Sequence, residues 1–228
     1  MIRLDDVRKI YTRRGESVTA FQCDRLTIEQ GDYVAVVGPS GSGKTTLLSL
    51  LGGMLSPTAG KVEVADVSLY DVSPAARAAL RRERMGFVFQ TFNLVPYLTA
   101  LENVQLPLCL AGLPSAEQAA RATEMLERFG LGERLGHKPT EMSVGQQQRT
   151  ALARTLVNNP RIILADEPTG NLDPASRELV LQALAECHRE GRTIVMVTHD
   201  PVAAKEAART LTLRGGKLTT ALPESQAA

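Results

Sequence analysis

The sequence predicts an α/β protein in which helices cover both faces of a central sheet. Four short apolar runs, at 33–37, 87–89, 162–165 and 193–197, contain few polar residues, which is typical of strands buried on both faces. Between them lie longer stretches with the pattern of amphipathic helices, and this alternation favours α/β packing. A glycine-rich segment, GPSGSGKTT at 38–46, joins the first apolar run to one of these helical stretches.

The N-terminal region departs from this pattern. Ile2 and Leu4, and later Leu26 and Ile28, alternate with polar residues. Alternation of this kind is typical of an antiparallel sheet with one face in water. We therefore expect an antiparallel β subdomain at the start of the chain.

Several helix starts are marked by capping residues. Three expected helices begin with a cap residue followed directly by proline, at Ser73, Asp173 and Asp200. Two more begin with serine and glutamine at capping-box spacing, Ser115 with Gln118 and Ser143 with Gln146. The helix after the glycine-rich segment is expected to begin at Thr45.

A helical pattern from about 101 to 135 interrupts the succession of strands, so we expect an inserted helical subdomain. The predicted organisation is one domain, 1–228. Its core, with the β subdomain, comprises 1–90 and 160–219, and the helical subdomain comprises about 91–159. The last residues, 220–228, are expected to fray.

Composition excludes several classes of function. The chain has 228 residues, enough for a sizeable core, and a formal net charge of +1. A charge so near zero provides no basic surface for nucleic acid, so no nucleic-acid partner is predicted. Three scattered cysteines indicate a reducing compartment. No apolar run approaches the roughly 20 residues of a membrane span, so a role at a membrane requires a separate membrane partner.

The segment 38–46 matches the phosphate-binding pattern G-x-x-x-x-G-K-[ST] between a strand and a helix, which is the context that this pattern requires. Glycines allow backbone N–H groups to approach phosphate oxygens, and the helix N-terminus adds partial positive charge. Lys44 supplies a cation for the β and γ phosphates, and the Thr45 hydroxyl can bind Mg²⁺. The predicted phosphate-binding residues are Gly38, Pro39, Ser40, Gly41, Ser42, Gly43, Lys44, Thr45 and Thr46.

Two carboxylates follow the apolar run at 162–165. Asp166 ends a buried strand, so its charge needs a cation or hydrogen bonds. Ligands of α/β sheets bind at the carboxyl ends of the strands, which places Asp166 beside the phosphate loop as an Mg²⁺ ligand. Glu167 is then the expected general base that activates water for attack on the γ-phosphate. By itself, such a pair is more often part of a solvated loop.

Two further polar residues follow apolar runs. His199 comes after the run at 193–197 and is predicted to contact the γ-phosphate, although a lone histidine is usually structural. Gln90 follows the run at 87–89 and is predicted to reach Mg²⁺ or the attacking water. Its alternative is an ordinary surface amide.

Taken together, these motifs resemble the nucleotide-binding domain of ATP-binding cassette (ABC) transporters. The phosphate loop, Gln90, MSVGQ at 142–146, IILADE at 162–167, GNLD at 170–173 and His199 occur in the order typical of that family, over essentially residues 1–219. The resemblance implies a P-loop NTPase core with an antiparallel β subdomain and an inserted α-helical subdomain. It also implies an ATPase that uses ATP and Mg²⁺.

The resemblance adds roles for residues outside the core motifs. Tyr11 is implied to stack on adenine, and Asp173 to contact the opposite subunit; their alternatives are strand packing and a helix cap. The family forms head-to-tail dimers, in which two ATP molecules lie between the phosphate loop of one subunit and the MSVGQ segment of the other. The residues implied to contact ATP from that segment are Ser143, Gly145 and Gln146.

The segments FQTFNLVPYLTALENVQLPLCLAG and LADEPTGNLD look most like lipoprotein-release and macrolide-export ATPases. That resemblance implies a separate membrane permease docking near 91–106 and a peripheral location on the cytoplasmic face of the cell membrane. It also implies export or extraction of a lipoprotein, lipid, peptide or drug-like substrate. A periplasmic adaptor would be reached through the permease.

Three alternatives remain open at this point. An importer ATPase for a small solute shares the same motifs, although such subunits often carry a C-terminal regulatory domain. A cell-division or signalling cassette would act through a membrane partner without transport. A soluble cassette acting on DNA or ribosomes usually has coiled-coil inserts, zinc motifs or tandem cassettes, which this sequence lacks.

One position departs from the family pattern. Val144 stands where the usual L-S-G-G-Q has its first glycine, and Met142 replaces the leucine. The methionine conserves volume and should cost little. Valine is tolerable if its φ is negative and its side chain points away from phosphate, but a positive φ would strain a β-branched residue.

Overall fold

The computed structural model describes residues 1–13, 15–170 and 172–220. The expected frayed tail therefore lies outside the described residues from 221 onward, as does Asn171 of the GNLD segment. No helix within the described ranges is both long enough and apolar enough to span a membrane.

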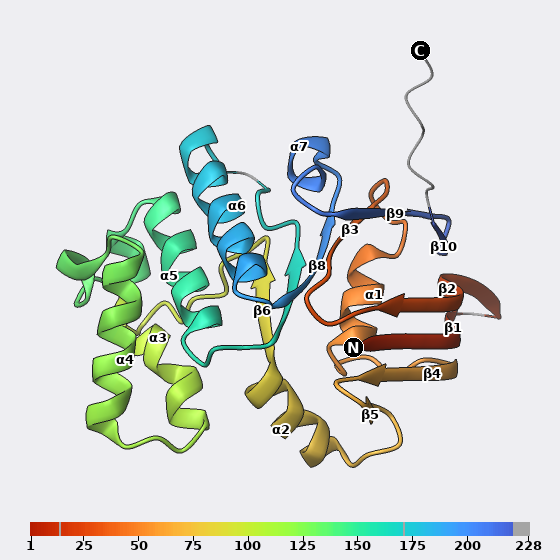
Figure 1. Ribbon diagram of the computed structural model, residues 1–228, viewed down its shortest axis with the longest axis horizontal. Helices are drawn as coiled ribbons and strands as arrows, with labels where there is room; N and C mark the ends of the chain where they lie inside the picture. Colours follow the sequence, from red (N-terminus) through yellow and green to blue (C-terminus); the bar gives the residue numbers. More distant parts are fainter. Residues whose placement is uncertain (14, 171, 221–228) are drawn as a thin grey trace.

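Strands of the described residues form one sheet, in the order β5-β4-β1-β2-β10-β9-β3-β8-β7-β6 (Figure 1). The strands are β1 (Ile2–Arg13), β2 (Glu16–Ile28), β3 (Tyr33–Val37), β4 (Ala59–Val64), β5 (Val67–Ser68), β6 (Met85–Phe89), β7 (Ile162–Asp166), β8 (Thr193–Thr198), β9 (Arg209–Arg214) and β10 (Lys217–Thr220). One end of this sheet is parallel and the other antiparallel.

The parallel part confirms the four predicted apolar strands. β3, β6, β7 and β8 contain the four runs, and they pair in parallel in the order β3-β8-β7-β6. Val34 faces Val195, for example, and Leu164 faces the same residue from β7. These strands are buried almost throughout because helices cover both of their faces.

The antiparallel part confirms the predicted β subdomain. β1 pairs with β2 so that Ile2 faces Ile28 and Leu4 faces Leu26, and all four side chains are buried. β4 adds to the other edge of β1, again in antiparallel orientation. β10 joins this part to the parallel strands, because it pairs with both β2 and β9.

The helices are α1 (Lys44–Leu51), α2 (Pro74–Arg84), α3 (Ala100–Leu110), α4 (Ser115–Arg128), α5 (Val144–Leu156), α6 (Pro174–Arg189) and α7 (Pro201–Ala204). Short 3-10 turns lie at Gly132–Arg134 and Pro139–Glu141. Helices α3, α4 and α5 pack together between β6 and β7 in the chain and lie to one side of the sheet (Figure 1).

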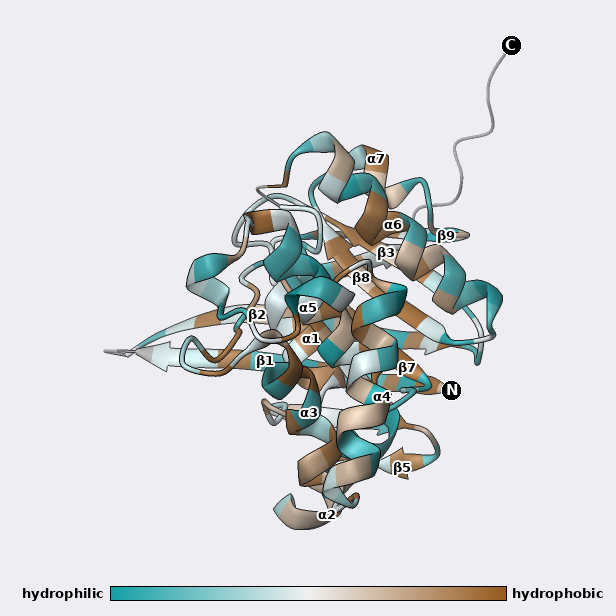
Figure 2. Cartoon of the chain, turned by 90° about the vertical axis from the view of Figure 1, so that its left-hand side faces the viewer, coloured by the Kyte–Doolittle hydropathy of each residue, from teal (hydrophilic) through white to brown (hydrophobic). Residues whose placement is uncertain are grey.

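Helix α1 lies at the centre of one of two hydrophobic cores. It contacts β2 and β4 of the antiparallel part and β7 and β8 of the parallel part, so the sheet curls around it (Figure 1). Leu47, Leu50 and Leu51 are fully buried there. The second core lies on the other face of the parallel strands, against α3 to α6. Figure 2 shows the apolar strands inside and polar residues on the outer faces of the helices.

Most of the predicted helix starts are confirmed. Ser73, Asp173 and Asp200 each accept a hydrogen bond from a backbone N–H in the first turn, and a proline follows each of them. Helix α1 begins at Lys44, one residue earlier than predicted.

The predicted cap at Ser115 is wrong. The N-cap of α4 is Pro114, and Gln118 instead donates its side-chain amide to the carbonyl oxygen of Leu113, at 2.7 Å. The side chain of Gln118 thus closes the preceding loop rather than the helix end. A capping box that sequence reasoning missed begins α3, where Thr99 and Glu102 bond to each other's backbone N–H groups.

Candidate nucleotide-binding site

The phosphate loop lies between β3 and α1 and is shaped by contacts that exclude side chains. Gly43 has φ of 104°, and a Cβ there would overlap the carbonyl oxygen of Ala20. A Cβ on Gly38 would overlap the carbonyl oxygen of Leu213. The loop is therefore held against β2 and β9 with its backbone N–H groups available for an anion. Among the described residues, the buried hydroxyl of Ser42 has no hydrogen-bond partner.

Lys44 is buried at the first position of α1 and points back over the loop. Its Nζ donates to the carbonyl oxygens of Gly38, at 2.7 Å, and Pro39, at 3.1 Å. It also lies 3.6 Å from Oε1 of Glu167. A buried ammonium is costly unless it is paired, so these contacts explain why the lysine is tolerated there. The glycine cradle, the unpartnered Ser42 hydroxyl and the lysine together fit a phosphate group.

Asp166 ends β7 beside the start of α1. Burial raises the pKa of Asp166, and a hydrogen bond from Thr45 opposes this effect in part. The neighbouring carboxylate of Glu167 raises the pKa further, and Lys44 lowers it. A cation bound next to Asp166 would therefore relieve an unfavourable buried charge.

Glu167 has an unusual backbone for a glutamate, with φ of 45°. This conformation is sparsely populated outside glycine, and it tends to occur at functional sites. The backbone N–H of Glu167 donates to the carbonyl of Val197, at 2.9 Å, which joins the ends of β7 and β8. Its Oε2 accepts from the Thr198 hydroxyl and the His199 N–H, each at 3.1 Å, and lies 2.9 Å from His199 Nδ1.

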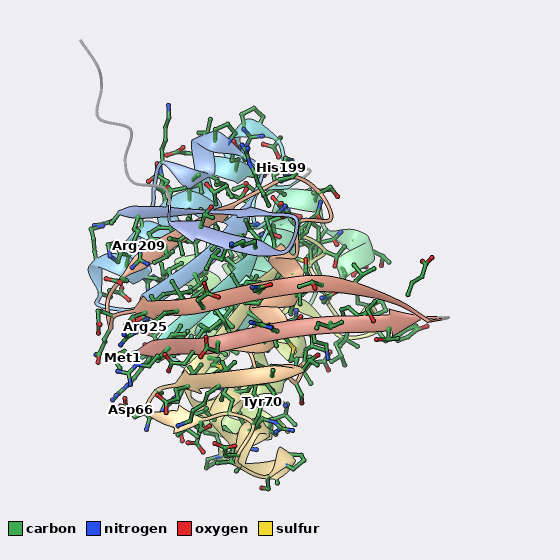
Figure 3. The ribbon with its side chains drawn as sticks, turned by 90° about the vertical axis from the view of Figure 1, so that its right-hand side faces the viewer. Met1, Arg25, Asp66, Tyr70, His199 and Arg209 are labelled. Atoms are coloured by element: carbon green, nitrogen blue, oxygen red, sulfur yellow. The ribbon has the colours of Figure 1, made fainter. Side chains whose placement is uncertain are left out.

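These residues line one cleft of about 910 Å³ at the carboxyl ends of β3, β7 and β8. The predicted residues brought together there are Pro39, Ser40, Gly41, Gly43, Lys44, Thr45, Thr46, Gln90, Asp166, Glu167 and His199. A separate depression of about 600 Å³ lies at the opposite ends of the strands, lined by Met1 and Asp66 among others. Figure 3 shows His199 far from both of these residues.

Sequence reasoning missed part of the cleft wall. Val18, Thr19 and Ala20 of β2 line it, as do Gly215 and Gly216 in the turn between β9 and β10. The Gly-Gly pair is a turn signal, and it could have indicated a close approach of two backbones. The three β2 residues belong to no sequence motif that would have indicated a place in the cleft wall.

Tyr11 lies near the edge of this cleft rather than among its lining residues. It pairs with Val18, which does line the cleft, and its side chain is 47% exposed. The Lys9 ammonium lies 5.2 Å from the centre of its ring. About half of the Tyr11 side chain is therefore accessible to solvent.

The MSVGQ segment lies outside the cleft of its own chain. Ser143 caps α5 and forms the predicted capping box with Gln146, with Ser143 N–H to Gln146 Oε1 at 2.9 Å. The backbone of Gly145 lies against Ser176 of α6, whose side chain bonds to Asp173. Met142 is buried, in keeping with a conservative replacement of leucine.

Val144 is the first residue of α5 and is absent from the residues with positive φ in the described chain. Its side chain is 51% exposed. The first condition for tolerating a valine at this position, a backbone φ that is not positive, is therefore met.

A family model described as "ABC transporter" matches residues 21–170, well over half of the chain. The chain belongs to the ABC transporter family. As an ABC cassette it is an ATP-binding ATPase subunit, with the P-loop NTPase fold.

Two relatives and one solved structure illustrate the similarity of this ABC cassette to others. The uncharacterized ABC transporter ATP-binding protein YvrO of Bacillus subtilis (strain 168) is 46% identical over 96% of this chain and 95% of YvrO. The macrolide export ATP-binding/permease protein MacB of Hyphomonas neptunium is 46% identical over the whole chain, which spans 35% of MacB. The dimeric ABC cassette MJ0796, in a post-hydrolysis state bound to ADP and Pi, matches with a TM-score of 0.89, 40% identity, and coverage of 96% of this chain and 98% of that one.

The oxygen donors of the ABC cassette fit Mg²⁺ only in combination with a nucleotide. Thr45, Gln90 and Asp166 line the same cleft and offer a hydroxyl, an amide oxygen and a carboxylate. Within the described ranges, no cluster of three His, Cys, Asp or Glu side chains could hold a metal by itself. Mg²⁺ usually binds proteins through one or two carboxylates together with water and substrate phosphates, which matches this donor set.

Asp166→Asn is expected to raise the Tm of the nucleotide-free cassette at neutral pH. A carboxyl group whose pKa is raised on folding favours the folded state at low pH, and this contribution is lost as pH rises through the folded pKa. The Tm gain should therefore shrink as the pH is lowered toward that pKa. Calorimetry from pH 4 to 8 measures this difference in Tm. Each kcal/mol of stability corresponds to roughly 2–4 °C in Tm for a protein of this size. A lower Tm for the variant at pH 7.5 would contradict the inferred burial cost.

Val144→Gly is expected to leave the ATPase rate within about twofold of wild type and to lower stability by up to about 1 kcal/mol. Glycine in a helix costs roughly 0.5–1 kcal/mol relative to alanine, while the valine already has an acceptable conformation. Urea unfolding and a steady-state assay measure both quantities. Val144→Ala serves as the control, since it removes the methyl groups without the loss of helix propensity that glycine brings. A large gain in rate for the glycine variant alone would show that the wild-type segment is impaired.

Proposed function

We propose that this cassette is the ATP-hydrolysing subunit of a transporter, and that a separate membrane permease moves the substrate. The observation that carries the proposal is the single cleft in which Lys44, Thr45, Asp166, Glu167 and His199 meet. A cation, oxygen donors for a metal, a carboxylate base and a histidine are the groups that phosphoryl transfer to water requires.

In this proposal the phosphate loop binds and orients the ATP phosphates. Backbone N–H groups of the loop and the N-terminus of α1 contact the phosphates, and Lys44 exchanges its carbonyl contacts for phosphate oxygens. Thr45, Gln90 and Asp166 would hold Mg²⁺, which supplies charge neutralisation along the phosphates when bound. Tyr11 would stack on the adenine from the edge of the cleft.

Glu167 is the proposed base. Its carboxylate is fixed by the Thr198 hydroxyl and the His199 N–H, so one oxygen is oriented while the other faces Lys44. Once phosphate takes over Lys44, the freed oxygen can accept a proton from the attacking water. His199 lies against the same carboxylate and would contact the γ-phosphate.

A head-to-tail dimer would complete the site. Ser143 and Gly145 lie outside the cleft of their own chain, so they are available to the ATP bound by a second copy. The N-terminus of α5 would add a favourable dipole, typically worth about 0.3–2 kcal/mol. Asp173 caps α6 next to Gly145 and would lie at the same interface. Dimerisation is supported by the dimeric solved cassettes, and ATP binding would close the dimer.

The permease is proposed to dock near 91–106. Tyr97 is 82% exposed there, and a small cleft of about 370 Å³ lies between Phe92, Leu94 and Pro96 on one side and Pro139 on the other. Arg154 of α5 holds this segment, because its guanidinium donates to the carbonyl oxygens of Phe92 and Asn93, both at 2.7 Å. Movement of α5 on dimer closure would thus reach the docking segment directly.

The proposed substrate class and location are supported by one of the relatives. MacB combines an ATP-binding part with a permease for macrolide export in one chain, which supports export or extraction of a lipoprotein, lipid, peptide or drug-like molecule here. The cassette would then lie peripherally on the cytoplasmic face of the membrane and could reach a periplasmic adaptor through the permease.

Purification of the tagged protein from detergent-solubilised membranes tests this proposal. Recovery of a multi-span membrane protein in stoichiometric amount is expected, and an Arg154→Ala variant should recover less of it. Recovery of ribosomes or DNA without a membrane protein would refute the transporter function. Transport of a small solute into vesicles by the recovered complex would instead identify an importer.

A further inference from the structure

A second cleft, of about 290 Å³, adjoins the nucleotide cleft. Both clefts are lined by Gln90, Glu167 and His199, the three residues placed around the γ-phosphate in the proposed function. From these residues the second cleft extends away from the phosphate loop, to Arg177 of α6 and Asp200 at the start of α7. It therefore opens on the γ-phosphate end of the nucleotide and not on the adenine end.

Arg177 is poorly satisfied by its surroundings. Its Nη1 lies 3.6 Å from Oδ2 of Asp200, which is an ion pair but too long for a hydrogen bond. The buried Nε of Arg177 and the buried Oδ2 of Asp200 each have no hydrogen-bond partner among the described residues. A guanidinium has five N–H donors and suits the oxygens of a phosphate group. The Arg177 side chain is 41% exposed and lines the second cleft, so its guanidinium presents a cation to that cleft.

We propose that the second cleft is a transit site for inorganic phosphate, with Arg177 as the group that binds it. The proposal rests on the proposed function, which supplies the phosphate. In hydrolysis, the water oxygen forms a bond to the γ-phosphorus, the bond from that phosphorus to the β–γ bridging oxygen breaks, and the proton of the water passes to Glu167. The phosphate so released lies between the two clefts, while ADP still occupies the phosphate loop.

The charges around the second cleft make this site weak, as a transit site must be. Glu167 is neutral immediately after it takes the proton, so it does not repel the phosphate at that moment. The Asp200 carboxylate, 3.6 Å from Arg177, offsets part of the attraction of that arginine, and its Oδ1 accepts a hydrogen bond from the N–H of Val202, at 2.9 Å. His199 is 68% exposed and faces the same space. Removal of the Asp200 charge should therefore strengthen phosphate binding.

Equilibrium dialysis with radiolabelled inorganic phosphate, in the presence of ADP and Mg²⁺, tests the proposal without requiring turnover. We expect Arg177→Ala to weaken phosphate binding at least tenfold, while Arg177→Lys keeps most of it. Asp200→Asn should tighten binding severalfold, because an asparagine can still cap α7 through its side-chain oxygen. Arg189→Gln, at the far end of the same helix and exposed, is the matched control and should change nothing.

The outcomes distinguish this inference from the proposed function. Equal phosphate binding by wild type and both Arg177 variants would mean that phosphate binds only in the nucleotide cleft, and it would overturn the transit site. Weaker binding by the Asp200→Asn variant would count against it as well. ATP hydrolysis by the wild-type protein is measured separately and tests the proposed function. An absence of hydrolysis would count against the proposed function but would leave the phosphate binding measured by dialysis unchanged.

Discussion

Replacement of Glu167 by glutamine is expected to lower ATP turnover by about 10²–10⁴-fold, the usual contribution of a general base, without weakening ATP binding. Glutamine has nearly the same shape, and its side-chain oxygen can still accept from the Thr198 hydroxyl and the His199 N–H. It cannot take a proton from water, however. It also removes the negative charge that lies 3.6 Å from Lys44. The variant should therefore bind ATP normally but hydrolyse it far more slowly.

Size-exclusion chromatography, which reports the dimer, and an assay of ATP turnover together test this prediction. With Mg²⁺ and ATP, the Glu167→Gln variant should elute as a stable dimer, and with ADP it should not. Glu178→Gln is a matched control on the exposed side of α6, where the Glu178 carboxylate accepts a hydrogen bond from the side-chain amide of Gln182 in the same helix. Hydrolysis by the Glu167 variant at the wild-type rate would exclude Glu167 as the base.

Lys44→Ala is expected to lower ATP affinity by roughly 10–150-fold or more. A hydrogen bond to a charged group contributes about 1.5–3 kcal/mol, and each 1.4 kcal/mol is a factor of ten in affinity. The lysine is the cation of the phosphate loop, and it is already positioned within that loop by the carbonyls of Gly38 and Pro39. Loss of the lysine also removes a hydrogen-bond donor from each of these two carbonyl oxygens.

Titration of the purified variant with a fluorescent ATP analogue gives the affinity directly. Lys205→Ala, a change at an exposed lysine after α7, should bind as tightly as wild type. A thermal melt without nucleotide separates lost affinity from lost folding. Unchanged nucleotide affinity in a folded Lys44 variant would show that the phosphate loop does not hold the nucleotide.

Elements with strong local signals were predictable from the sequence. The apolar runs of β3, β6, β7 and β8 were each visible because strands buried on both faces need no polar residues. Caps at Ser73, Ser143 and Asp173 were visible because the cap and the N–H it binds lie within three residues. The phosphate loop was visible for the same reason, since its chemistry is contained in nine consecutive residues, 38–46.

Other features depended on distant contacts and could not be predicted locally. The side chain of Gln118 has the spacing of a capping box but bonds to Leu113, because the chain enters α4 from that loop. Arg177 belongs to the second cleft only because α6 packs near the end of β8, where Asp200 lies. The wall formed by β2 and the Gly215–Gly216 turn depends on the pairing of β10 with β2.

The sequence by itself determined the fold class, the order of the motifs and the chemistry that we propose for each one. These properties are local, because a loop, a cap or a strand-end carboxylate is specified by neighbouring residues. Only the tertiary structure decided which motifs share a cleft. Gln90, Asp166 and His199 are far apart in the chain, and they meet the phosphate loop because β6, β7, β8 and β3 are adjacent and parallel. The same packing leaves Ser143 outside that cleft, and it gives Val144 an exposed place and an ordinary helical backbone at the start of α5.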